Sequence, residues 1–200
     1  METFDAIKER RSVKHYDQNH SLTEDEINQL MSLAVLSPTS FNMQNWRFVL
    51  VKDPEKKKQI RAASWDQAQV TDCSLLVVLC ADLKAWKKNP SQYWRDAPKE
   101  AQEFLVNAMG PFYEGKDELQ RDEAMRSCGI AAQTIMLTAK AMGYDSNPMI
   151  GFSPEKVGEI INLPKDHVIS MMIVIGKQIQ PPMPRGGQLS LSDVVFTDGF

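Results

Sequence analysis

The run Leu75-Leu76-Val77-Val78-Leu79-Cys80 decides the fold, because it is apolar without a single polar interruption. A strand with one face in water alternates apolar and polar residues, whereas a strand covered on both faces does not. The run therefore predicts a central strand with other elements packed over both of its sides. Two further strands are expected at Trp46–Val51, which is rich in aromatic and branched residues, and at Ser170–Ile175.

Helix signals alternate with these strands. Thr23 and Glu26 have the spacing of a capping box, and an apolar stripe follows them. Asp53-Pro54 and Ser153-Pro154 each place a capping side chain before a proline, as at the start of a helix. A short helix is also expected over residues 5–11. Intermixed helices and buried strands indicate the α+β class.

A long helix is expected from about Glu118 to Met142, with Gly143 as its C-terminal signal. Between Cys128 and Ala141 small or apolar residues occur around most of its circumference. A helix of this kind is expected to be buried, often against a partner subunit.

Composition restricts the classes of function. A chain of 200 residues is expected to form one domain. Its net charge of −3 argues against general affinity for nucleic acid, so an anion site has to be built locally. No apolar run has the length of a membrane span, and the start of the chain lacks a secretory pattern. A cytoplasmic protein without membrane or nucleic-acid partners is the expectation.

Cysteine and histidine positions predict no metal site. Cys73, Cys80 and Cys128 are odd in number and widely spaced, which argues against a disulfide framework or a zinc site. Cys80 and Cys128 are expected to be small core residues. The three histidines show no ligand spacing.

Two polar segments are candidates for ligand binding. Arg10, Arg11, Ser12 and Lys14 offer three cations and a hydroxyl, a combination that suits a phosphate with neighbouring hydroxyls. Residues 37–46 place amide and hydroxyl side chains in a loop, where they can hydrogen-bond a flat ligand rich in heteroatoms. Taken singly, each segment has a simpler interpretation. The arginines can be a solvated helix end, and residues 37–46 can be an ordinary loop.

No other nucleotide or hydrolase motif competes with these segments. The chain contains neither a G-x-G-x-x-G fingerprint nor a G-x-x-x-x-G-K-[ST] loop, which disfavours a Rossmann or P-loop site. It also lacks a G-x-S-x-G elbow.

Two later segments, residues 147–154 and 176–186, complete a pattern with these two. With Asn147-Pro148-Met149-Ile150-Gly151-Phe152-Ser153-Pro154, Gly176-Lys177 and Pro184-Arg185-Gly186, the chain resembles the nitroreductase family over nearly its whole length. The resemblance implies a central, mainly antiparallel sheet flanked by helices, in an intertwined homodimer. Residues 1–200 would form one FMN-binding domain, with a helical excursion at about 84–116 and a tail at about 177–200 that wraps the partner.

The resemblance also implies roles for individual residues. The Arg10–Ser12 motif and Arg185 would hold the phosphate and ribityl chain of FMN, and the 38–44 loop would come from the opposite subunit. Ile150 N–H would lie at flavin N5. The full set of expected cofactor-binding residues is Arg10, Arg11, Ser12, Lys14, Pro38, Thr39, Ser40, Asn42, Gln44, Gln67, Gln69, Pro148, Met149, Ile150, Gly151, Lys177 and Arg185.

Three residues depart from the family pattern. Lys14 and Tyr16 stand where Arg and Phe are commoner, and Asn45 stands where Pro is usual. The tail carries only Arg185 where two or three basic residues are frequent. These differences reduce the positive charge expected around the phosphate without removing it.

The activity implied is FMN-dependent oxidation of NADH or NADPH, with a nitroaromatic or quinone as the small-molecule acceptor in a ping-pong sequence. The flavin carries the chemistry, so no side chain is expected to act as acid or base. Two alternatives stay open: a flavin carrier or sensor without turnover, and a reductase of another acceptor such as an enal or a halogenated phenol.

The aromatic residues between Lys84 and Lys116 have two interpretations. They can form the core of a helical excursion. Alternatively, they can form a wall or lid over a planar substrate.

Overall fold

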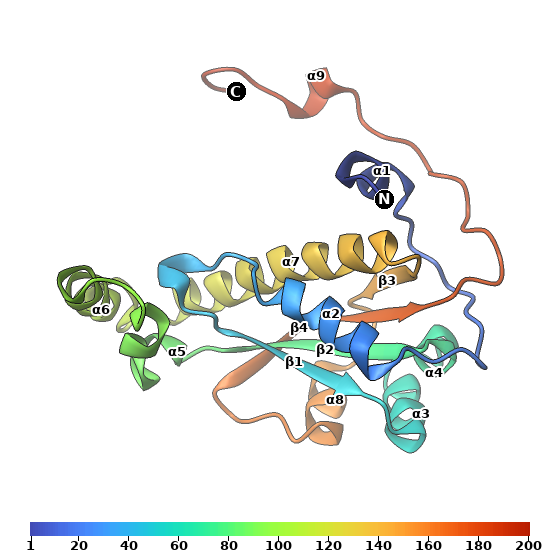
Figure 1. Ribbon diagram of the computed structural model, residues 1–200, viewed down its shortest axis with the longest axis horizontal. Coiled ribbons are helices and arrows are strands. Elements are labelled where there is room, and N and C mark those ends of the chain that lie inside the picture. Colours follow the sequence, from blue (N-terminus) through green and yellow to red (C-terminus); the bar gives the residue numbers. More distant parts are fainter.

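The computed structural model describes all residues from Met1 to Phe200. Four strands form one antiparallel sheet in the order β1-β2-β4-β3, as Figure 1 shows. The strands are β1 Trp46–Val51, β2 Leu75–Asp82, β3 Asp145–Met149 and β4 His167–Gly176. The helices are α1 Thr3–Glu9, α2 Glu24–Ala34, α3 Pro54–Ala62, α4 Gln69–Asp72, α5 Ala85–Lys88, α6 Lys99–Tyr113, α7 Asp117–Ala141, α8 Pro154–Ile160 and α9 Leu191–Val194, with 3-10 turns η1 Ser40–Asn42 and η2 Pro90–Trp94.

Strand β2 is buried along its whole length, which confirms that it is covered on both faces. Successive side chains of a strand point to opposite faces of the sheet. Leu75, Val77 and Leu79 therefore pack with α2 and α7, whereas Leu76 and Val78 pack with α3 and α8. The result is a sheet between two helical layers (Figure 1), the predicted antiparallel α+β architecture.

Helix α7 packs a stripe of small residues on the sheet. Cys128, Ala131 and Ile135 are fully buried, and alanine at the contact allows the helix to approach the strands closely. The opposite side is not covered, since Ile130 keeps 42% exposure. The prediction of burial thus holds for one face of α7 within a single chain.

The predicted capping signals are confirmed, whereas the helix expected over residues 5–11 runs from Thr3 to Glu9. Thr23 and Glu26 form the reciprocal capping box of α2, and the Asp53 side chain accepts from Glu55 N and Lys56 N at the start of α3. Gly143 follows α7 with a φ of 81°, a left-handed conformation that glycine adopts without steric cost.

Strand β3 was not among the strands predicted from the sequence. It begins at Asp145 and includes Pro148 and Met149, two of the expected cofactor-binding residues. Its residues have low strand propensity, and pairing with β4 overrides that preference. Pro148 is tolerated because β3 is an edge strand.

The C-terminal tail extends away from this body. After β4 the chain passes alongside α1 and ends beyond it (Figure 1), and residues 183–200 are exposed throughout. None of the helices is long and apolar enough to cross a membrane.

Tyr144→Phe is expected to destabilise the protein near neutral pH but not in strong acid. The Tyr144 hydroxyl donates to Glu26 Oε1 at 2.5 Å, and this bond, followed by those from Thr23, lowers the Glu26 pKa from 4.5 to about 2. A lowered carboxyl pKa contributes stability that is complete above pH 4.5 and is lost as the pH falls through about 2. Thermal unfolding at successive pH values should therefore show that the difference in Tm between the wild type and Tyr144→Phe disappears as the pH falls from 4.5 to about 2.

Tyr16→Phe is the matched control. The Tyr16 hydroxyl donates to the backbone carbonyl of Val13 at 2.9 Å, an acceptor that does not titrate. Its Tm deficit should stay constant over the same pH range. A Tyr144→Phe deficit that is equally constant would contradict the role given to Glu26.

Candidate functional site

The segment after α1 and the C-terminal tail enclose a pocket of about 520 Å³. Arg185 Nη2 donates to Lys8 O at 2.9 Å and to Arg10 O at 3.3 Å, and Arg11 Nη2 donates to Met183 O. These bonds fix the tail over the end of α1. Five of the predicted residues line the pocket, namely Arg10, Arg11, Ser12, Lys14 and Arg185, together with His15 and the rest of the tail from residue 180 to 188.

Positive charge accumulates in this pocket, which we call the cation cradle (Arg10, Arg11, Ser12, Lys14 and Arg185). Burial lowers the pKa of Arg10, and the nearby charges of Arg185 and Arg11 lower it further. Arg10 Nη1 is buried and has no hydrogen-bond partner. An unpaired buried donor among like charges is unfavourable, so the cradle is suited to an anion such as a phosphate.

A second group of predicted residues lies around the end of β3. Gln67 Nε2 donates to Gly151 O at 2.9 Å, and Gln69 Nε2 donates to Gln67 Oε1 at 3.0 Å and approaches Met149 Sδ at 3.9 Å. The Ile150 side chain is 79% exposed. Gln69 and Met149 are only 5% exposed, so the part of this group that is open to the edge of a flat heterocycle is the half-buried Gln67 amide with the main chain of residues 150–151.

Strand β3 joins the second group to the cation cradle. Val13 N donates to Ser146 O at 3.1 Å, and Ser12 forms a β-bridge with Ser146. The residues predicted to bind the phosphate and those predicted to bind the ring therefore lie near opposite ends of the same short strand.

The predicted 38–44 loop lies elsewhere, beside α6 and the start of α7. Tyr113 OH donates to Ser40 Oγ at 2.8 Å, and Asn42 Nδ2 donates to Tyr93 O at 2.8 Å. Ser40 N also donates to Glu123 Oε1 at 3.3 Å. Asn42 and Gln44 line a second pocket of about 530 Å³ with residues of η2.

Helix α7 separates this loop from the cation cradle (Figure 1). The loop contacts Glu123 near the start of α7, and the cradle contacts Ser146, just after its end. With 25 residues, α7 is roughly 37 Å long. A single small ligand cannot touch both groups within one chain.

Backbone strain concentrates next to predicted residues. Of seven non-glycine residues with positive φ, five lie in the 38–44 loop or directly before Gln67: Phe41, Asn42, Gln44, Trp65 and Asp66. Such conformations persist where the surroundings hold them, and they occur frequently at functional sites.

Some aromatic residues between 84 and 116 are core residues, and others are exposed as a wall or lid would require. Trp86 and Tyr113 are buried and pack together, as core residues do. Phe104 and Phe112 are exposed, so they are available to a partner or ligand.

Lys177 lies apart from the other predicted residues. Its ammonium donates to Gly143 O at 2.7 Å and lies 4.1 Å from the centre of the Tyr144 ring. The positive charge is thus placed at the C-terminal end of α7, where it interacts favourably with the helix dipole.

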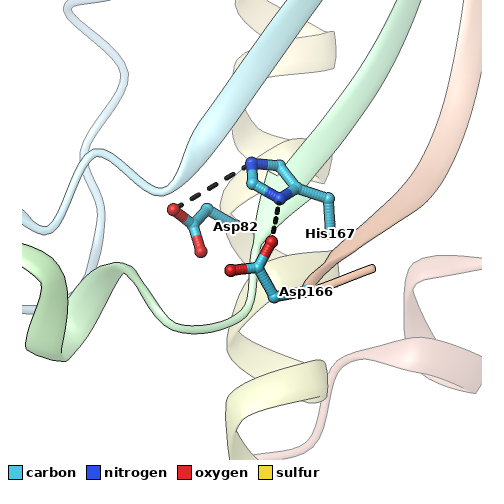
Figure 2. Close-up of side chains that lie close together, drawn as sticks. All are labelled: Asp82, Asp166 and His167. Carbon is cyan, nitrogen blue, oxygen red and sulfur yellow. Dashed lines mark hydrogen bonds and ion pairs between the residues drawn. The ribbon is translucent and has the colours of Figure 1, made fainter. Parts of the chain in front are cut away.

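Sequence reasoning missed a cluster of charged residues at the end of β2. His167 Nδ1 lies 2.7 Å from Asp166 Oδ1, and His167 Nε2 lies 4.0 Å from Asp82 Oδ2 (Figure 2). Lys88 Nζ, which Figure 2 does not draw, is 2.7 Å from a carboxylate oxygen of both aspartates. Residues distant in sequence form it, so no local spacing could have revealed it.

The ammonium of Lys88 makes this cluster an ion-pair network. It occupies the position between the two carboxylates, and Arg47 adds a further contact to Asp82 at 3.6 Å. Hydrogen bonds from Lys88 and His167 lower the pKa of Asp166 to about 2. The network therefore ties α5 to the ends of β2 and β4.

The cysteines are core residues, as predicted for Cys80 and Cys128. All three are free and buried. Burial raises the pKa of Cys73 to about 11 and those of Cys80 and Cys128 to about 12. Thiols in this state are poor nucleophiles.

The fold and the sequence have counterparts among known proteins. A family model described as "Nitroreductase family" matches residues 7–177. Protein DrgA of Synechocystis sp. is 53% identical over 180 residues, which are 90% of this chain and 86% of DrgA. The oxygen-insensitive NADPH nitroreductase of Helicobacter pylori is 30% identical over 183 residues, 86% of each protein.

A solved structure is similar over almost the whole chain. It is a crystal structure, in complex with FMN, of a nitroreductase-type protein from Exiguobacterium sibiricum. The TM-score is 0.92 at 29% identity, covering 98% of this chain and 97% of the other. Fold and sequence together define an oxidoreductase. The chain belongs to the nitroreductase family.

Lys88→Met is expected to lower the free energy of unfolding by about 1–3 kcal/mol, because the buried Asp82 carboxylate loses its nearest counter-charge. The loss stays below that of a fully buried pair, since the Lys88 side chain is 42% exposed. Urea unfolding measures it. Lys87→Met is the control, because the Lys87 ammonium lies only over the Trp86 ring, at 5.5 Å. Equal losses in both variants would contradict the network.

Proposed function

We propose that the protein is an FMN-dependent NAD(P)H oxidoreductase that reduces nitroaromatic or quinone-type acceptors. The cation cradle carries this proposal, because the unpaired Arg10 Nη1 beside Arg11 and Arg185 needs an anion. The relatives add support. The E. sibiricum structure holds FMN, and the H. pylori relative is named for NADPH-dependent nitroreduction.

The cradle is assigned to the FMN phosphate. Arg10, Arg11 and Arg185 would pair with phosphate oxygens, since guanidinium binds them through parallel hydrogen bonds. Ser12 would add a short hydroxyl donor, and Lys14 would reach the ribityl chain or the edge of the ring.

The group around β3 is assigned to the flavin ring. Gln67 and Gln69 would hydrogen-bond the pyrimidine edge, and Pro148–Gly151 would cover one face. Ile150 N–H donates to no other main-chain group of the chain and would point to N5. The chain thus binds and orients the ring and leaves one face accessible.

A bound flavin supplies hydride transfer, and reducing equivalents pass from NAD(P)H to the acceptor in two separate half-reactions, the ping-pong order. Donor and acceptor would occupy the same side, because residues 148–151 cover the other. No side chain is assigned an acid–base role.

The 38–44 loop is assigned to the flavin site of a second copy in a homodimer. Its distance from the cradle of its own chain, along α7, motivates this assignment. Exposed apolar residues supply an interface: Leu36 and Ile130 on the body, and Leu189, Leu191 and Val194 on the tail that would wrap the partner. Free buried cysteines fit a reducing compartment, and we place the protein in the cytoplasm.

Arg10→Ala is expected to weaken FMN binding roughly 10- to 100-fold, since one charge-assisted hydrogen bond is worth about 1.5–3 kcal/mol. Flavin absorbance after dialysis, and titration of the apoprotein with FMN, measure the change.

Bleaching of the bound flavin by NAD(P)H, with recovery on adding menadione, separates an enzyme from a flavin carrier.

Arg121→Ala serves as the control, because Arg121 is an exposed arginine of α7 outside the cradle. It should retain flavin like the wild type. If Arg10→Ala also keeps its full flavin content, the phosphate assignment is wrong.

Mixing two inactive variants is expected to restore activity if each site uses two chains. One variant, Arg10→Ala with Arg185→Ala, lacks the cradle, and the other, Asn42→Ala with Gln44→Ala, lacks the loop. A mixed dimer contains one intact site and one doubly damaged site. NAD(P)H:menadione turnover of the mixture, after dissociation and reassociation, should approach about one quarter of wild-type activity, since half of the dimers are mixed and each has one good site.

A mixture of two preparations of the same variant controls for recovery during reassociation. It should stay at the level of that variant. Absence of recovery in the mixed sample, with mixed dimers verified by mass, would place all binding groups of a site in one chain.

A further inference from the structure

The 38–44 loop has a backbone conformation that its own residues do not favour. Phe41, Asn42 and Gln44 have φ values of 52°, 49° and 45°, which residues other than glycine seldom adopt. Such a conformation persists only where the surrounding structure holds it. Contacts from outside the loop are therefore needed to keep its side chains in place.

The helical excursion at residues 84–116 supplies several of these contacts. Trp94 donates its indole N–H to Phe41 O at 3.0 Å. The Asn42 amide donates to Tyr93 O at 2.8 Å. Met43 is 3% exposed and packs in the small apolar cluster of the excursion. The excursion thus holds the loop in its strained conformation.

Ser40 is held at both of its donor groups. Tyr113 OH donates to Ser40 Oγ at 2.8 Å, and Ser40 N donates to Glu123 Oε1 at 3.3 Å. Tyr113 is fully buried and Glu123 is 9% exposed. Burial raises the pKa of Tyr113, so its hydroxyl stays protonated at neutral pH and remains a donor. Glu123 Oε1 also accepts from Ser127 Oγ at 3.1 Å, which fixes the carboxylate.

This arrangement leaves the proton of the Ser40 hydroxyl free. Ser40 Oγ accepts from Tyr113 and makes no other hydrogen bond within the chain. A hydroxyl can accept and donate at the same time, and accepting a hydrogen bond makes it a stronger donor. Because Ser40 is half-buried, its hydroxyl can donate to an acceptor outside the chain.

We propose that Tyr113 is a positioning residue for cofactor binding, which orients the Ser40 hydroxyl so that it donates to an oxygen atom of the FMN held by a second copy. Glu123 holds the main chain of Ser40 in the same role. The inference rests on the proposed function, because that function assigns the 38–44 loop to the flavin site of the second copy. Tyr113 touches neither flavin nor substrate and takes no part in electron or proton transfer.

Removal of the Tyr113 hydroxyl tests this role. Tyr113→Phe should raise the Kd for FMN about 3- to 10-fold, because a Ser40 hydroxyl that is no longer oriented donates less well. Equilibrium dialysis of the FMN-loaded protein gives the Kd. Tyr93→Phe is the matched control, since the Tyr93 hydroxyl belongs to the same excursion but donates to Ala85 O, at 3.3 Å. Its Kd for FMN should equal that of the wild type.

A double-mutant cycle separates positioning from general support of the fold. Ser40→Ala removes the hydroxyl through which Tyr113 is proposed to act. In the Ser40→Ala background, Tyr113→Phe should therefore leave the Kd for FMN unchanged. A loss of affinity of the same size in both backgrounds would show that Tyr113 does not act through Ser40, and the proposal would be wrong.

Mixed dimers test which chain Tyr113 serves. When the Arg10→Ala, Arg185→Ala variant pairs with the Asn42→Ala, Gln44→Ala variant, the single intact site takes its loop from the chain that lacks the cradle. Tyr113→Phe on that chain should raise the Kd of the intact site for FMN, and Tyr113→Phe on the other chain should not. The reverse result would overturn the assignment to the second copy.

Failure of the proposed function would give a different result. A wild-type protein that binds no FMN would overturn that function and the role of Tyr113 with it. A wild-type protein that binds FMN, with an affinity that Tyr113→Phe leaves unchanged, would overturn the role of Tyr113 alone.

Discussion

Burial of β2 on both faces is the constraint on which the rest of the structure depends. Its alternate side chains belong to two separate cores, one with α2 and α7 and one with α3 and α8. An antiparallel sheet with one helical layer would leave half of these residues in water. Two helical layers are therefore needed. The connections between them run past the ends of the strands, where the polar groups of the candidate site and of the ion-pair network lie.

The candidate site lies at the edge of this arrangement. Strand β3 pairs with β4 on one side and takes the chain after α1 on the other, through the Ser12–Ser146 bridge. The same strand ends at the turn whose Gly151 carbonyl accepts from Gln67. One short edge strand therefore connects the cation cradle with the amide surface and fixes their relative positions.

Helix α7 has the opposite effect, because it keeps the 38–44 loop away from the cradle. Its small buried residues let it lie flat along the sheet, and its length sets the separation. The ion-pair network of Lys88 with Asp82 and Asp166 anchors the α5 region to the same end of the sheet as that loop. Within one chain this geometry keeps the 38–44 loop and the cation cradle apart, which is the physical reason for proposing that a second copy supplies the loop.

The sequence alone determined the elements whose signals are local. The unbroken apolar run of β2, the capping box at Thr23, the Asp53-Pro54 start of α3 and Gly143 after α7 each specify their structure through nearest neighbours, and all were predicted. The candidate site residues could also be proposed from the sequence, because the type of side chain alone indicates that arginines can bind an anion and that amides can hydrogen-bond a ring.

Only the tertiary structure decided which of these residues meet. Asp145-Ser146-Asn147 has low strand propensity, and it becomes β3 because β4 offers free hydrogen-bonding groups beside it. The Asp82–Asp166–His167 cluster and the hydrogen bond of Tyr113 with Ser40 join residues far apart in the chain. Local patterns cannot encode such contacts, because they follow from how the two helical layers and the sheet pack together.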